Sequence, residues 1–207
     1  MAHGMEVSTE NSKIITNSMS NISADISMNG QKLEEPTSFK YLGATLCKNG
    51  TCSVEVRIRI ASAMAAMVKL NRIWRSNTIS FVSKVKMTKC LVTSILLYGC
   101  EAWTLLAHSD KRIQDFETKS LMKLLRISYL EHKTSDWLRS KINSCVPLEP
   151  LLAPVKRQKL AWFGHVTHHN SLSKTILRGT LMSGQPNGQQ RKCWIDNIKA
   201  DIPAHAN

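Results

Sequence analysis

Few residues in this chain have the types and spacing that chemistry requires. His165 and His169 stand four residues apart on one predicted helix face, and with His168, Cys145 and Cys193 they could be offered as zinc ligands. Structural zinc sites usually contain closely spaced cysteine pairs, and the histidines have none beside them. Polar histidines on the surface of a basic helix are the simpler interpretation, so we expect no metal site and no cofactor.

Nucleophilic and acid–base sites are equally poorly supported. Cys145, His165 and Asp196 could be assembled into a Cys/His site, but nothing in their spacing favours one. Two-metal phosphoryl chemistry needs paired carboxylates, and no Asp-Asp pair occurs in the 207 residues. The acidic doublet Glu34-Glu35 lies in a predicted hairpin, where a polar turn explains it. We therefore predict no catalytic residue and no enzymatic activity for the chain as it stands.

Basic residues are the strongest chemical signal. The chain has 28 Lys and Arg against 15 Asp and Glu, a net charge of +13, which favours a polyanionic partner. Between Val54 and Leu91 there is a single acid, Glu55, and such an imbalance favours phosphate contact over an ordinary solvated face. The predicted nucleic-acid-binding residues are Arg57, Arg59, Lys69, Arg72, Arg75, Lys84, Lys86 and Lys89.

The elements that must position these residues change character along the chain. Residues 1–50 read as short strands, with a hairpin signal at Asn29-Gly30 and a further strand over residues 39–46. From Thr51 the apolar spacing changes to about 3.6 residues, which predicts a long helix whose buried stripe runs from Val56 to Trp74. We therefore expect a mainly α fold with a small antiparallel β element at the N-terminus.

Further helices complete a predicted bundle. One runs from Ser80 to about Tyr98 and is apolar almost all round in its second half, which indicates a central position. Ser109-Asp110 is the expected cap of a third helix, and Thr134 or Ser135 that of a fourth. After a proline-containing linker at 145–150, we expect a helix over 151–168 and a last short one near Trp194. The predicted segments are 1–50, 51–144 and 151–207.

The five tryptophans have two interpretations. They could be platforms on which bases stack, as aromatic side chains are in single-strand binders. Most lie among apolar neighbours at helical spacing, so we expect them in the core, although the pattern is less clear for Trp103 and Trp194. They are Trp74, Trp103, Trp137, Trp162 and Trp194.

Targeting signals and membrane spans are not evident. Apolar runs such as residues 95–98 are too short to cross a bilayer, and the opening residues do not have the pattern of a secretory signal. Six scattered cysteines lack the spacing of a disulfide framework. We expect an intracellular protein, in the cytoplasm or nucleus, with no membrane partner.

Five short stretches, taken in order, resemble the region that follows the polymerase active site in LINE-type (non-LTR) retrotransposon reverse transcriptases. They are residues 4–13, 39–43, 94–103, 162–166 and 191–196, and together they extend over most of the chain. The resemblance implies the end of a palm, a thumb-like basic helical bundle and a C-terminal helical extension. It also implies a primer-grip-like role for Phe39, Lys40, Tyr41, Leu42 and Gly43.

The same resemblance implies what polymerase chemistry would need. In the family, Mg²⁺ is held by aspartates of a palm that lies before the matching region, and an endonuclease domain stands further upstream. The family also has a lysine near the incoming nucleotide, for which Lys13 is a loose match, and an Arg- and Gly-rich loop for which residues 183–190 are a poor one. We therefore expect a remnant that binds RNA or an RNA–DNA duplex without polymerase activity.

Three alternatives remain open. The chain could be an inactive, pseudogene-like product, or a helical module that a host reuses for protein contacts. It could also act in trans with a palm supplied by another chain. The salt dependence of nucleic-acid binding separates the first two from the binding hypothesis.

Overall fold

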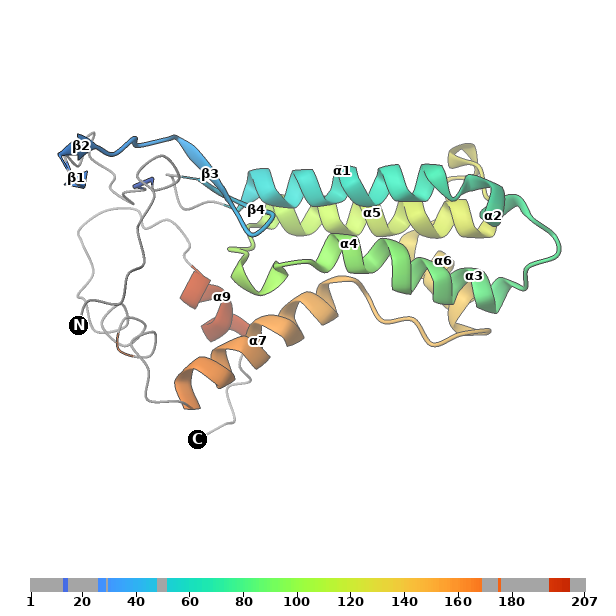
Figure 1. Cartoon of the computed structure of the whole chain (residues 1–207). Coiled ribbons are helices and arrows are strands. Elements are labelled where there is room, and N and C mark those ends of the chain that lie inside the picture. The colour runs from blue at the N-terminus through green and yellow to red at the C-terminus, as the bar shows by residue number, and fades with distance from the viewer. Residues whose placement is uncertain are drawn as a thin grey trace, which may run out of the picture. The chain divides into compact units, whose positions relative to one another are not determined.

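The computed structural model describes residues 13–14, 26–28, 30–47, 52–168, 175 and 194–201. The chain divides into two compact units, Met1–Glu55 and Val56–Asn207. Two small antiparallel sheets belong to the first unit, and helices make up the second (Figure 1). The predicted fold class, mainly α with a small β element, is confirmed.

The first hairpin forms where the sequence predicted it. Strands β1 (Ser27–Met28) and β2 (Gln31–Lys32) are antiparallel, and Met28 pairs with Gln31 across a two-residue loop. Gly30 in that loop has φ +77°, a conformation that costs glycine nothing. Beside it, the Lys13 amine lies 3.0 Å from the Glu34 carboxylate, so the lysine that loosely matches the family motif is engaged in an ion pair.

The second hairpin corrects a prediction. In place of one strand over residues 39–46, the chain forms β3 (Ser38–Tyr41) and β4 (Ala44–Cys47) around a turn at Leu42 and Gly43. Both turn residues have positive φ, 47° and 82°, as a tight hairpin turn requires. Leucine is rare in that conformation, so nothing in the sequence indicated a turn at Leu42, and its apolar side chain suggested that the strand continued. After the turn, the main-chain nitrogen of Thr45 in β4 donates a hydrogen bond to the Glu55 carboxylate at 2.8 Å.

Helices account for most of the described residues. They are α1 (Ser53–Lys69), α2 (Asn71–Arg75), α3 (Phe81–Met87), α4 (Ser94–Leu97), α5 (Ala107–Leu125), α6 (Ser135–Asn143), α7 (Leu152–His168) and α9 (Trp194–Asp201). A π-helical turn, η1 (Thr88–Thr93), joins α3 to α4, and 3₁₀ turns occur at η2 (Cys100–Ala102) and η3 (Tyr129–Glu131).

The first long helical segment follows its predicted stripe. Val56, Ala63 and Met67 of α1 are buried, and so is Trp74 of α2. The helix is interrupted at Leu70, and the Trp74 indole donates across the interruption to the Met67 carbonyl at 2.9 Å. The apolar spacing therefore identified the buried face correctly and missed the break.

The second helical segment runs through α3, η1 and α4 between its predicted ends. The Ser80 hydroxyl accepts from the Ser83 amide, and Gly99, at φ +69°, ends the segment. The expected central position of its second half is wrong, because Leu91 and Tyr98 are exposed while Val92 and Leu96 are buried. The segment therefore has an exposed side as well as a packed one, and Val92 and Tyr98 both line an open groove.

The N-caps predicted for two helices have different outcomes. Thr134 caps α6 as predicted, and its hydroxyl accepts from the Trp137 amide. The predicted cap Ser109-Asp110 is wrong, because α5 begins at Ala107 without a side-chain cap and Ser109 is buried in its first turn. Ser109 is therefore a packed residue inside the helix and does not cap its N-terminus, although serine is a common N-cap residue.

The last helix docks on α7 and the segment before α5 through one amide side chain. Asn197 of α9 accepts from the Leu105 main-chain nitrogen at 2.7 Å and donates to the Leu105 carbonyl at 2.9 Å. The buried Lys159 amine donates to the same side-chain oxygen at 3.0 Å. The predicted short helix near Trp194 is confirmed, and its attachment is polar as well as apolar.

Candidate nucleic-acid interface

The eight predicted basic residues have different environments. Arg57, Lys69, Arg72, Arg75, Lys86 and Lys89 are exposed, Arg59 is half-buried and Lys84 is buried. On α1, Val56, Ala63 and Met67 define the buried side, and at about 100° per residue Arg57 and Lys69 fall on well-separated parts of the remaining surface. The basic residues of α1 therefore do not form a single stripe.

Arg59 is engaged with an aromatic ring. Its guanidinium carbon lies 4.4 Å from the centre of the Tyr98 ring. This cation–π contact joins α1 to the end of α4, and it stabilises the bundle while leaving the guanidinium only partly exposed. Arg59 therefore has a packing role whether or not it meets phosphate.

Lys84 does not fit the predicted role. Its side chain is only 6% exposed, and its amine donates to the Ser76 carbonyl at 2.5 Å. Burial lowers the pKa of Lys84, and the nearby charge of Arg126 lowers it further. The side chain is directed inward to satisfy a helix end, so we correct the candidate set by removing it.

A second cation, Arg126, also donates hydrogen bonds to carbonyls at the end of α2. The Arg126 guanidinium donates to the carbonyls of Trp74, Arg75 and Ser76, with the shortest distance, 2.6 Å, to Arg75. These carbonyls belong to the C-terminus of α2, where a helix has unpaired acceptors and a partial negative charge. Lys84 and Arg126 thus neutralise the end of α2 and fasten it to α3 and to the end of α5.

The junction of α2 and α5 carries a basic hollow of about 510 Å³. Its lining contains three cations, Arg75, Lys123 and Arg126, no carboxylate, and apolar residues that include Trp74. The residues that line this basic hollow are Asn71, Trp74, Arg75, Met122, Lys123, Arg126 and Ile127. Anionic groups are attracted to such a concave cationic surface.

Sequence reasoning missed two members of the basic hollow. Lys123 and Arg126 lie about fifty residues after Arg75, and only the packing of α2 against α5 brings them together. The available signal was weak: both stand at the end of a predicted helix, where basic residues commonly complement the dipole. Their grouping with Arg75 is a property of the tertiary structure.

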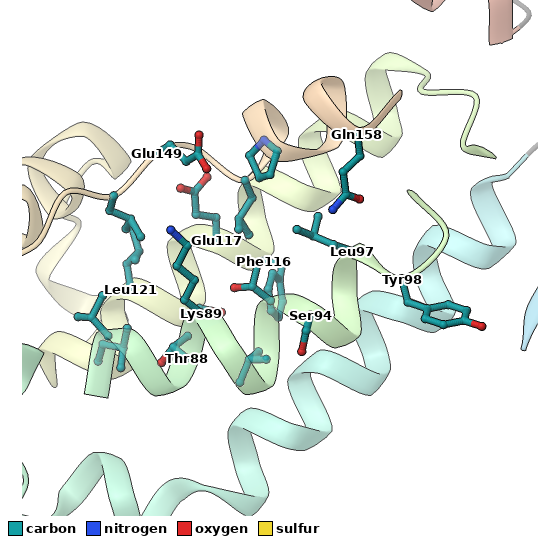
Figure 2. A pocket seen from close by; sticks show the side chains of 18 of the residues that line it. Thr88, Lys89, Ser94, Leu97, Tyr98, Phe116, Glu117, Leu121, Glu149 and Gln158 are labelled. Carbon is teal, nitrogen blue, oxygen red and sulfur yellow. The ribbon is translucent and has the colours of Figure 1, made fainter. Parts of the chain in front are cut away.

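A second hollow, a groove of about 520 Å³, is lined by other residues (Figure 2). Its walls come from the helical segment 85–98, from α5, and from the linker and first turns of α7. The lining is mainly apolar, and it includes Phe116 and Leu121. Lys89 is the predicted basic residue that lies in it.

The carboxylates of this groove have partners within the chain. Arg157 donates to both Glu149 oxygens, at 2.9 and 2.7 Å, and the pKa of Glu149 is lowered, first by this hydrogen bond and then by nearby positive charge including that of Lys89. Arg139 donates to both oxygens of the buried Glu117, at 3.1 and 2.8 Å. The groove therefore offers an apolar surface with internally compensated charge, unlike the basic hollow.

The tryptophans divide differently from the prediction. Trp74 and Trp103 are buried, so the less clear case of Trp103 is a core residue. Trp137 and Trp162 were expected in the core and are instead 42% and 41% exposed. Trp162 packs edge-on against Trp194 with 5.2 Å between ring centres, and the Trp194 indole donates to the Glu101 carbonyl at 2.7 Å.

The primer-grip-like residues lie together at the β3–β4 hairpin of the first unit. Phe39, Lys40 and Tyr41 are in β3, and Leu42 and Gly43 form its turn. Tyr41 and Leu42 are exposed at the tip. The hairpin shape agrees with what the resemblance implies, and the role of these residues stays a prediction.

Metal-binding and nucleophilic groupings do not emerge from the described part of the chain. No cluster of three or more His, Cys, Asp or Glu that could hold a metal is found there. His165 and His168 are exposed on α7, while the proposed co-ligands His169 and Cys193 lie outside the described residues. The family-like stretch 4–13, apart from Lys13, and the loop at 183–190 also lie outside them.

Membrane insertion receives no support from the helices that the structure describes, since none combines enough length with enough apolar character to cross a bilayer. Within the described residues the cysteines are free thiols. Cys100 is buried and donates to the Gln158 side-chain oxygen at 2.7 Å, and burial is the main reason that its pKa is raised to about 12.

Comparison with known proteins gives one informative similarity. The chain is 25% identical to an uncharacterized transposon-derived protein of Caenorhabditis elegans, over 96% of this chain and 73% of that protein. No family model matches the chain, and no solved structure matches it. The similarity supports a transposon origin and does not by itself identify a type of element or an activity.

Proposed function

We propose that the chain is the thumb-like part of a LINE-type reverse transcriptase and that its helical unit binds RNA or an RNA–DNA duplex without carrying out polymerisation. The transposon-derived relative supports the origin. The five family-like stretches in order supply the more specific assignment. The binding partner follows from charge, because an excess of basic side chains on a surface neutralises phosphates and releases their counterions.

The basic hollow is the observation that carries this proposal. Arg75, Lys123 and Arg126 converge there from α2 and α5, and no acid lines it. Exposed Lys69 and Arg72 lie in the same part of the chain as Arg75, at the end of α1 and in α2. Surface charges of one sign gathered at the end of a bundle indicate contact with a polyanion through its backbone, which conveys position and not sequence.

Polymerase chemistry is not part of the proposal. The chain has no Asp-Asp pair, and both groove carboxylates described above are engaged by arginines. Two metal ions at a polymerase centre need carboxylates free to bind them. A catalytic palm, and with it Mg²⁺, would have to be supplied by residues other than these.

The test compares binding of the full chain to a labelled RNA–DNA hybrid over a range of salt concentrations. The variant Arg72→Gln/Arg75→Gln/Lys123→Gln removes three exposed or hollow-lining cations. The control Lys111→Gln/Arg112→Gln/Lys199→Gln removes three exposed cations elsewhere on the same unit. Both variants have the same net charge, so they differ only in where the charge was lost.

The proposal predicts a shallower dependence of log affinity on log salt for the first variant than for the control. Each lost phosphate contact reduces the slope by roughly 0.7 to 0.9. Equal slopes in the two variants would show that only total charge matters and would reject the basic hollow as the site. Absence of binding by the unaltered chain at low salt would reject nucleic-acid binding altogether and favour the inactive or protein-interaction alternatives.

A further inference from the structure

The turn between α5 and α6 presents large side chains to solvent beside the basic hollow. Tyr129 is 73% exposed and Leu130 is 81% exposed. Trp137, in the first turn of α6, is also exposed. We call residues 128–133 together with Trp137 the aromatic turn. Single exposed apolar residues are common on proteins, but two large exposed aromatic rings within nine residues, one of them with a lysine over its face, are not explained by packing.

The aromatic turn is held in shape by its own hydrogen bonds. The Ser128 hydroxyl accepts from the Leu130 amide, and the Ser128 amide donates to the Glu131 carboxylate at 3.2 Å, which forms a capping box around η3. Arg126 and His132, on either side, both have left-handed φ values, 58° and 47°. Such residues cost of order 1 kcal/mol or more and often mark functional segments. The rings are therefore presented by a defined turn.

One lysine and one histidine lie beside these rings. The Lys133 amine is 5.0 Å from the centre of the Trp137 ring, and the His132 ring is 6.4 Å from that of Tyr129. Ile127, two residues before Tyr129, lines the basic hollow, so the turn begins at the rim of that hollow. Because Tyr129 stands two residues after Ile127, at most about 7 Å of chain separates it from the rim.

Two acids, Glu131 in the aromatic turn and Asp136 beside it, have partners within the chain. Glu131 accepts the Ser128 amide in the capping box. The Asp136 carboxylate lies 3.5 Å from the Arg139 guanidinium. Asp136 is nevertheless 92% exposed, so the groups that distinguish this surface are its aromatic rings and the Lys133 amine beside one of them.

We propose that the aromatic turn binds single-stranded nucleic acid, with unpaired bases stacked on Tyr129 and Trp137 and the backbone phosphates held by Lys133 and the basic hollow. Aromatic rings bind bases through their faces, which a duplex conceals and a single strand exposes. The inference extends the proposed function, since both share the basic hollow. It adds a specificity for unpaired strands that phosphate contact alone would not produce.

The test uses two labelled probes, an unstructured RNA oligonucleotide and an RNA–DNA hybrid without overhangs, with the full chain. Tyr129→Ala removes the ring, and the matched control Tyr129→Phe keeps the ring and loses only the hydroxyl. Because Tyr129 is mostly exposed, neither change disturbs the core. The expected result is a loss of roughly 5- to 100-fold in affinity for the single strand with Tyr129→Ala, the range that one base stack gives, and little change with Tyr129→Phe. Affinity for the hybrid should be the same in all three proteins.

Several outcomes would overturn the inference. Single-strand affinity unchanged by Tyr129→Ala would show that the ring does not stack, and an equal loss on both probes would show that it does not distinguish unpaired bases. If the unaltered chain binds the hybrid and not the single strand, the aromatic turn has another partner while the proposed duplex binding stands. If it binds neither probe, both proposals fail together.

Discussion

The guanidinium of Arg126 and the main-chain oxygen of Trp74 are hydrogen-bonded at 3.3 Å although they stand 52 residues apart in the sequence. The same guanidinium also reaches the carbonyls of Arg75 and Ser76. This one side chain closes the C-terminus of α2 and joins it to the end of α5. The basic hollow exists because these two helix ends are fastened together.

Replacing Arg126 tests how much this junction contributes to stability. We expect Arg126→Met to lower the free energy of unfolding by about 1 to 2 kcal/mol, because charged donors to helix-end carbonyls are lost and water replaces them only in part. Urea denaturation followed by circular dichroism measures this difference. Arg112→Met, an exposed position in α5 with a comparable loss of charge, is the control. Equal midpoints for the two variants would contradict a role for Arg126 in the junction.

Lys84 and Lys86 should give opposite results although they are two residues apart. Lys84 is buried and bonded to Ser76, whereas Lys86 is exposed. We therefore expect Lys84→Met to reduce the melting temperature and leave the salt slope of hybrid binding unaltered, provided that binding is measured well below that temperature. Lys86→Met should leave the melting temperature unaltered. A reduced salt slope for Lys84→Met at constant secondary structure would show that the buried assignment is wrong.

The two arginine–carboxylate pairs should differ in strength. Arg139 is bonded to the buried Glu117, and this hydrogen bond is the main reason that the pKa of Arg139 is raised. Removal of a partner from a buried pair leaves an uncompensated charge, so Arg139→Met should cost about 3 kcal/mol in unfolding free energy. Arg157→Met breaks the equally bidentate but exposed pair with Glu149, where water and salt screen the charges. A similar cost for both variants in the same denaturation assay would contradict this ranking.

Thiol reactivity has a clear order in the native chain. Cys100 is fully buried and its pKa is about 12, so at pH 8 almost none of it is thiolate, the reactive form. Cys90 and Cys145 are exposed. Iodoacetamide at pH 8 followed by peptide mass mapping should modify these two in minutes and Cys100 only after denaturant is added. Because the raised pKa keeps Cys100 protonated at both pH 7 and pH 9, raising the pH over this range should not make Cys100 react with iodoacetamide. Rapid native labelling of Cys100 would show that α7 opens readily.

Local signals predicted much of the fold for identifiable reasons. The spacing of Val56, Ala63 and Met67 marked a buried helix face, and Thr134 and Gly99 marked helix ends, because periodicity and capping depend on residues within a few positions of one another. The turn at Leu42 was missed because leucine has no turn preference, and its positive φ is imposed by the pairing of β3 with β4.

Composition by itself predicts a polyanionic partner, and this stays a prediction, since net charge is a sum over residues and does not depend on how they are arranged. Which of the basic residues are exposed, and which of them lie close together, was decided only by tertiary structure. Lys84 turns inward to a carbonyl eight positions away, while Lys123 and Arg126 join Arg75 from another helix. Exposure and convergence depend on contacts between distant segments, and one sequence carries no direct signal of those contacts.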